Sequence, residues 1–210
     1  MKTIKMILLF VMISSLQANA QTYKIDTSEI SYENKLRPCF EVKYDASAKD
    51  VKKAWDKFFN NYSVKIKGIG LFTNKDVISG TDVTIPAISD KRMDIYARIT
   101  DVAGGSELKY FMSFGYDFFI GPVEYPAEFE GMKKILNDFS VEFLNDFYAD
   151  EASSITGKIK DLKKDIRKNN KSVKKNNRKA RKGSSEVANG YAAKNTSLDM
   201  ENEENRRKIS

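Results

Sequence analysis

The chain has 210 residues and a net charge of +7, from 36 lysine and arginine residues and 29 aspartate and glutamate residues. It contains no histidine and a single cysteine, Cys39. These counts exclude an intrachain disulfide bond, any catalytic triad or dyad that uses histidine, and zinc sites with histidine ligands. We expect no enzymatic activity and no cofactor, because catalysis would have to rely on carboxylates, lysine or tyrosine, and the sequence contains no recognisable motif of that kind.

The first twenty residues have the pattern of a secretory signal peptide. A short basic start precedes the apolar run Met6–Ile13, and Ala18-Asn19-Ala20 has the small-x-small pattern of a cleavage site. Eight apolar residues span about 12 Å as a helix, which is too short for the roughly 30 Å of hydrocarbon in a bilayer. The pattern predicts cleavage between Ala20 and Gln21, a secreted or periplasmic location, and a mature chain without a transmembrane segment.

Charge is unevenly distributed along the chain. Residues 21–150 hold 17 basic and 21 acidic residues, a net charge of −4, whereas residues 151–210 hold 17 and 8, a net charge of +9. Such asymmetry is typical of two parts with different partners. The expected organisation is a signal peptide at 1–20, a loose lead-in at 21–37, an α+β domain at 38–150, a basic helical extension at 151–182 and a disordered tail at 183–210.

Hydrophobic periodicity predicts the first elements of the domain. Residues 38–44 alternate as a strand does, with Phe40, Val42 and Tyr44 on one face. Ser47 and Asp50 resemble the capping box of a helix. Apolar residues then recur at helical spacing, and we interpret Trp55, in the middle of that stripe, as a core anchor. The stripe consists of Val51, Ala54, Trp55, Phe58, Phe59 and Tyr62.

The rest of the domain is predicted to contain four strands and a long helix. Period-two patterns over 63–67 and 77–85 indicate two strands, and those over 94–101 and 108–114 indicate a hairpin around a glycine-rich turn. A helix is expected from Pro126 to about residue 150, with a stripe of Met132, Ile135, Leu136, Phe139, Phe143 and Phe147.

These elements predict an α+β fold, a curved antiparallel sheet of about five strands in the order β-α-β-β-β-β-α, with both helices on one face. This order resembles the helix-grip and TATA-box-binding-protein-like architectures. The stretches FEVKYDASAKDVKKAWDKFF and DIYARIT, with a charged C-terminal helix, are similar to uncharacterised secreted bacterial proteins. The resemblance implies a topology and no site residues.

An aromatic segment before the long helix is the first candidate binding site. In a helix-grip fold, Tyr116, Phe118, Phe119 and Tyr125 could line an apolar cavity beneath the helix, and the alternative is a closed edge of the core. Cys39 is expected to be a buried, inert thiol, because it lies within a predicted strand. Four aspartates near strand ends match no calcium loop and are interpreted as turn and cap residues. They are Asp82, Asp90, Asp94 and Asp101.

The extension begins with a short heptad seam. Ile155, Ile159, Leu162 and Ile166 follow 4-3-4 spacing. The same heptad continues as Asn169, Val173, Asn176 and Ala180, so the apolar seam is expected to fade after Ile166. Docking on the domain and weak self-association are both compatible with four apolar residues. Residues 183–210 are expected to be disordered or to form a short helix near 196–208.

Residues 158–182 contain 13 lysines and arginines and only two aspartates, a net charge of +11. Three interpretations stay open: a solvated helical tail, adhesion to an anionic surface such as membrane headgroups, lipopolysaccharide or cell-wall polymer, and nucleic-acid binding. Nucleic acid is disfavoured, because the segment has no aromatic residue for base stacking. The densest cations are Lys163, Lys164, Lys174, Lys175, Arg178, Lys179, Arg181 and Lys182.

The sequence therefore favours an exported, non-enzymatic binding or interaction module of unknown ligand, whose basic tail contacts anionic envelope surfaces. The alternative is a helix-grip carrier of a small hydrophobic ligand. A protein partner is also compatible with the extension.

Overall fold

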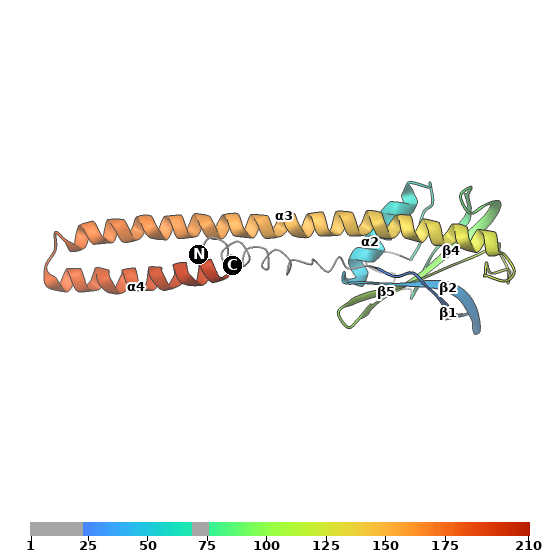
Figure 1. Ribbon diagram of the computed structural model, residues 1–210, viewed down its shortest axis with the longest axis horizontal. Coiled ribbons are helices and arrows are strands. Elements are labelled where there is room, and N and C mark those ends of the chain that lie inside the picture. The colour runs from blue at the N-terminus through green and yellow to red at the C-terminus, as the bar shows by residue number, and fades with distance from the viewer. Residues whose placement is uncertain (1–22, 69–75) are drawn as a thin grey trace, which may run out of the picture. The chain divides into compact units, whose positions relative to one another are not determined.

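The computed structural model describes residues 23–68 and 76–210. The chain divides into a first compact unit that ends at Leu144 and a second that spans Asn145–Ser210. The expected signal peptide and its cleavage site at Ala20 and Gln21 lie outside the described residues. The elements shown in Figure 1 are β1 (Asp26–Tyr32), β2 (Lys35–Tyr44), α2 (Ala48–Asn60), β3 (Val77–Ile85), β4 (Ser89–Val102), β5 (Gly105–Ser113), α3 (Pro126–Ala180) and α4 (Ser185–Arg207).

The first unit contains an open antiparallel sheet of five strands in the order β1-β2-β5-β4-β3. This confirms the α+β class, the five-stranded antiparallel sheet and the long C-terminal helix. Two details of the prediction are wrong. Strand β1 lies within residues 21–37, which were expected to be a loose lead-in, and residues 63–67 form only an isolated bridge between Lys67 and Ser79 instead of a strand. The chain order is therefore β-β-α-β-β-β-α-α.

The two edge strands of the sheet differ from regular ladders. The carbonyl of Glu29 in β1 accepts a hydrogen bond from Lys109 Nζ (3.3 Å), and that of Ser31 accepts one from Arg98 Nη2 (3.1 Å). On the other edge, the pairing of β3 with β4 shifts register twice, between Gly80 and Ile85. Both edges thus depart from a straight row of unpaired backbone groups.

The predicted hairpin is confirmed as β4 and β5, which pair from Asp94 with Ser113 to Val102 with Gly105. Gly105 is required by close approach of the backbone, because a Cβ atom at this position would lie 1.9 Å from the carbonyl oxygen of Tyr44.

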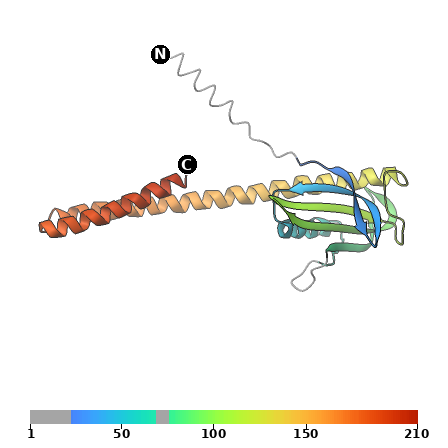
Figure 2. The same cartoon turned by 90° about the horizontal axis from the view of Figure 1, so that it is seen from below.

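Helices α2 and α3 pack on the same face of the sheet (Figure 2). The layer between them is filled by aromatic rings in contact: the centroids of Trp55 and Phe139 are 4.8 Å apart, and those of Trp55 and Tyr110 are 5.3 Å apart. The prediction of Trp55 as a core anchor is confirmed, since its side chain is fully buried. Burial of such rings is the main stabilising contribution in a domain of this size.

The start of α2 shows how local sequence orients this face. Ser47 is the N-cap, and its Oγ accepts a hydrogen bond from the backbone N–H of Asp50 (3.2 Å), as the capping pattern predicts. The backbone N–H of Ala48 donates to Oδ1 of Asp101 (2.8 Å), and that of Asp82 donates to Oδ1 of Asp94 (2.9 Å). Asp82, Asp94 and Asp101 therefore act as turn and cap residues.

The second unit is an antiparallel helical hairpin formed by the C-terminal part of α3 and by α4 (Figure 1). The expected disordered tail at 183–210 is wrong, because α4 covers Ser185–Arg207. The positions at which the two helices face each other are half-buried or buried and repeat with alternating spacings of three and four. They are Leu162, Ile166, Asn169, Val173, Asn176 and Ala180 on α3, and Ala188, Tyr191, Asn195, Leu198, Asn202 and Asn205 on α4.

Asparagine amides join the two helices of the hairpin. Asn195 accepts a hydrogen bond from Asn176 Nδ2 (2.9 Å) and donates one to Asn177 Oδ1 (2.7 Å). Seven residues along α4, Asn202 donates to Oδ1 of Asn170 (3.2 Å). We call these two arrangements the amide clamps. The seam therefore does not end at Ile166, but continues through polar residues that pair with each other.

Candidate anion-binding surface

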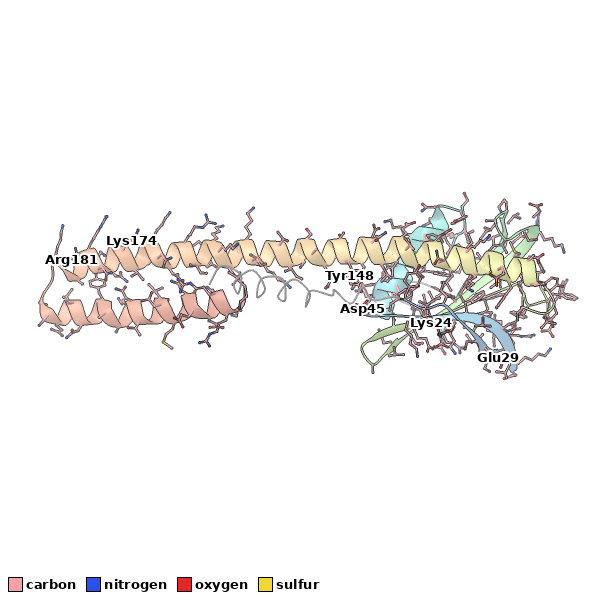
Figure 3. All side chains as sticks on the ribbon, viewed as in Figure 1. Lys24, Glu29, Asp45, Tyr148, Lys174 and Arg181 are labelled. Atoms are coloured by element: carbon pink, nitrogen blue, oxygen red, sulfur yellow. The ribbon has the colours of Figure 1, made fainter. Side chains whose placement is uncertain are left out.

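The heptad of α3 separates the seam from the cations. Positions that face α4 are half-buried, and the residues between them point outward. All eight cations singled out in the sequence are exposed: Lys163, Lys164, Lys174, Lys175, Arg178, Lys179, Arg181 and Lys182. Figure 3 shows Lys174 on α3 and Arg181 in the turn that follows it, before α4. Packing of the hairpin thus leaves the positive charge accessible.

Six cations line one open groove of about 350 Å³. Five of them belong to α3, where they are spaced by three, four and seven residues and therefore lie along one side of the helix. Lys163, Lys164 and Arg181, by contrast, do not line this groove. The lining residues are Lys171, Lys174, Lys175, Arg178, Lys179 and Lys182.

Little of this charge is neutralised within the hairpin. Of the 13 cations between 158 and 182, Lys168 alone forms an ion pair in the described part of the chain, with Asp165 (3.0 Å). The ammonium groups of Lys179 and Lys194 lie 5.9 Å and 5.7 Å from the ring centroid of Tyr191 on α4. A helix face with this density of unpaired cations attracts polyvalent anions through their summed field.

A second feature lies on the sheet face opposite the helices. We call it the outer-face cluster, and its central contact is between Tyr96 and Phe111, whose stacked rings are 5.1 Å apart. This cluster was not predicted from the sequence, although Cys39 and Phe111 lie at strand positions that point away from the helix-facing stripe. Its members are Ile30, Tyr32, Cys39, Val77, Tyr96, Phe111 and Phe119.

The structure does not bring the four predicted lining residues together. Tyr116 is 98% exposed and Phe118 is 61% exposed. Phe119 packs in the outer-face cluster, on the face of the sheet away from the helices, and Tyr125 packs edge-on against Phe114 at 4.9 Å. These side chains therefore line no common cavity beneath α3.

A tight turn explains the separation of these aromatic residues. Tyr116 has a positive φ of 50°, and the chain then returns so that Phe119 pairs with Ser113. The guanidinium of Arg37 lies 4.1 Å from the ring centroid of Phe119 and forms an ion pair with Asp117. Hydrogen bonds from Lys35 and Arg37 lower the pKa of Asp117. The turn is thus held by the ion pairs of Asp117 with Lys35 and Arg37, and by the packing of Phe119 in the outer-face cluster.

The raised pKa values of three tyrosines follow from their packing. Burial raises the pKa of Tyr96 to about 12 and also raises the pKa values of Tyr44 and Tyr110, which keeps these phenols protonated. Within the described residues, no group of three or more cysteine, aspartate or glutamate side chains is placed to hold a metal ion.

Cys39 is fully buried, which confirms the prediction from its strand position. Burial raises the pKa of its thiol to about 11. We expect iodoacetamide at pH 8 to leave native Cys39 unmodified and to label it after unfolding in guanidinium, as measured by intact mass. Labelling of the native protein at the rate of a free thiol would show instead that the outer-face cluster opens readily.

None of the helices in the described residues is both long and apolar enough to cross a membrane. Comparison with known proteins adds little to this description. No protein-family model matches the chain. No curated protein is similar to it. Among solved structures, CalU16 from Micromonospora echinospora aligns with 61% of this chain and 98% of its own, at 11% sequence identity and a TM-score of 0.24, a similarity too low to support an argument.

Proposed function

We propose that this protein is an exported, non-enzymatic interaction module whose helical hairpin adheres to phosphate-bearing envelope surfaces, foremost anionic lipid headgroups. The observation that carries the proposal is the groove lined by five exposed cations of α3 and by Lys182 just beyond it. Within the described residues, Lys168 alone is ion-paired among the cations of 158–182. The pattern of residues 1–20 supports action outside the cytoplasm, in the periplasm or in secreted form. Adhesion through such a surface needs neither a transmembrane helix nor an apolar insertion.

Binding to vesicles tests this proposal. Each cation near an anionic surface contributes about 1 kcal/mol, so replacing four of them should weaken binding by more than about a hundredfold. The test variant replaces Lys174, Lys175, Arg178 and Lys182 with glutamine. We expect the wild-type chain to bind vesicles that contain phosphatidylglycerol and not to bind vesicles of pure phosphatidylcholine. Raising the salt concentration should release the bound protein, because salt screens exposed charges.

A matched control separates the groove from net charge. Glutamine at Lys49, Lys53, Lys133 and Lys134 removes the same charge from exposed positions of the first unit and should leave binding nearly unchanged. Equal losses in the two variants would contradict a role for the groove. Parallel titrations with lipopolysaccharide and with duplex DNA identify the source of the phosphate, and tighter binding to DNA than to either envelope component would overturn the proposal.

The alternative function, a carrier of small hydrophobic ligands, would need space between the helices and the sheet. In the first unit that layer holds the contacting rings of Trp55, Phe58 and Phe139, with centroid separations of 4.8 Å and 5.5 Å to Phe139. We therefore place the proposed function on the hairpin.

A further inference from the structure

The heptad stripe of α3 extends beyond the segment that α4 covers. Asn195 bonds to Asn177 and Asn202 bonds to Asn170, so a step of seven along α4 matches a step of seven back along α3. In this antiparallel register the last residue of α4, Arg207, lies level with Asp165. Residues 150–158 of α3, which precede this point, lie beyond the end of α4 in this register.

The uncovered part carries the same stripe as the hairpin seam. Ala152, Ile155 and Ile159 continue, at spacings of three and four, directly into Leu162 and Ile166. Residues 150–158 are all exposed, and Ile155 is 53% exposed. Ile159 is half-buried, and the exposed residues 150–158 span about 14 Å of helix. The exposed stripe is thus continuous with a seam that already packs against a helix.

Charge along this segment is polarised. Asp150 and Glu151 lie at one end of the exposed segment, whereas residues 158–164 contain four lysines and one aspartate. A parallel pair of these helices would place like charges side by side. An antiparallel pair would place the acidic end of each helix against the basic end of the other, which favours that orientation.

We propose that this stripe is the interface of an antiparallel homodimer, in which a second copy of the chain covers Ala152, Ile155 and Ile159. Each Ala152 then lies opposite the partner's Ile155, with the two-fold axis passing between these positions, and the same patch is used by both protomers. The small alanine side chain makes room for the isoleucine. The two cationic hairpins point away from the axis in opposite directions, so the dimer presents two anion-binding surfaces, which increases avidity for an extended anionic surface.

Oligomeric state tests the interface independently of anion binding. Sedimentation velocity of the full chain should show a concentration-dependent mass that approaches two chains, and Ile155→Glu should raise the dissociation constant at least tenfold. Met200→Glu is the matched control, because Met200 is an exposed apolar residue on α4 that lies off the stripe. A single-chain mass for the wild type at every concentration, or identical masses for the two variants, would refute the dimer. If the wild type and the variants all have the mass of one chain at every concentration, and Ile155→Glu also loses vesicle binding, the stripe would instead contact a lipid surface.

Disulfide trapping tests the orientation. In a Cys39→Ala background, mixing Ala152→Cys with Ile155→Cys should give a mixed disulfide under mild oxidation. Ile159→Cys alone should give none, because two antiparallel copies of residue 159 are offset by eleven residues, about 16 Å along the axis. Efficient self-linking of Ile159→Cys would show a parallel pair and would overturn the proposed geometry.

Discussion

Replacing Phe139 with alanine is expected to destabilise the first unit by about 3–5 kcal/mol. Phe139 is 1% exposed, and its ring contacts Trp55, Phe58 and Phe143 at centroid distances of 4.8, 5.5 and 5.7 Å. Alanine removes these contacts and leaves a cavity in a layer that rings fill. The loss is a large share of the stability of a domain of this size.

Urea unfolding followed by tryptophan fluorescence measures this effect. Trp55 is the single tryptophan of the chain and is fully buried in the first unit, so its emission reports on that unit. Phe118→Ala is the matched control, because the same atoms are removed from a side chain that is 61% exposed, and it should change stability by less than about 0.5 kcal/mol. If Phe139→Ala unfolds at the wild-type midpoint, Phe139 does not anchor the core in solution.

Replacing both Asn169 and Asn202 with leucine is expected to stabilise the helical hairpin by about 2 kcal/mol or more. Asn169 Nδ2 and Asn202 Oδ1 are buried and have no hydrogen-bond partner among the described residues, and each such group costs about 1–3 kcal/mol. Both positions belong to a heptad seam, where leucine packs well. Asn170 would lose its bond from Asn202, but its exposed amide can bind water.

Thermal melting followed by circular dichroism at the helical band measures the hairpin, while Trp55 emission reports whether the first unit has changed. Asn189→Leu is the control, since Asn189 lies on the exposed side of α4 and its replacement adds only a few tenths of a kcal/mol of helix propensity. A lower melting temperature for the double variant would mean that Asn169 and Asn202 pair in solution and complete the second amide clamp.

The amide clamps also show why part of the fold could not be read from the sequence. Apolar periodicity correctly placed α2, the β4–β5 hairpin and the start of α3, because their buried faces are formed by apolar side chains. The same criterion predicted that the apolar seam fades after Ile166, because the next seam position is Asn169. An asparagine in a seam is satisfied only by a partner on the opposite helix, and a pattern within one helix does not reveal that partner.

The missed strand has a related cause. Strand β1 is at the sheet edge, and of its seven residues Ile30 is the only buried one, so no alternation marks it. Residues 63–67 show the opposite case, because Val64 and Ile66 alternate as in a strand and are buried, but the segment forms only one bridge. The cations of the candidate surface were predictable from composition, whereas their grouping along one groove depends on the helical conformation of residues 171–180.

The edges of the sheet determine how copies of this protein can associate without aggregating. An open sheet recruits foreign strands through unpaired backbone groups in a straight row. Here the side chains of Lys109 and Arg98 donate hydrogen bonds to the carbonyl groups of Glu29 and Ser31 on one edge. Two register shifts interrupt the strand pairing at the other edge. Strand addition and growth into fibrils are thereby disfavoured at both ends of the sheet. Copies can be held close together through a helix, at a crowded surface, without their sheets joining.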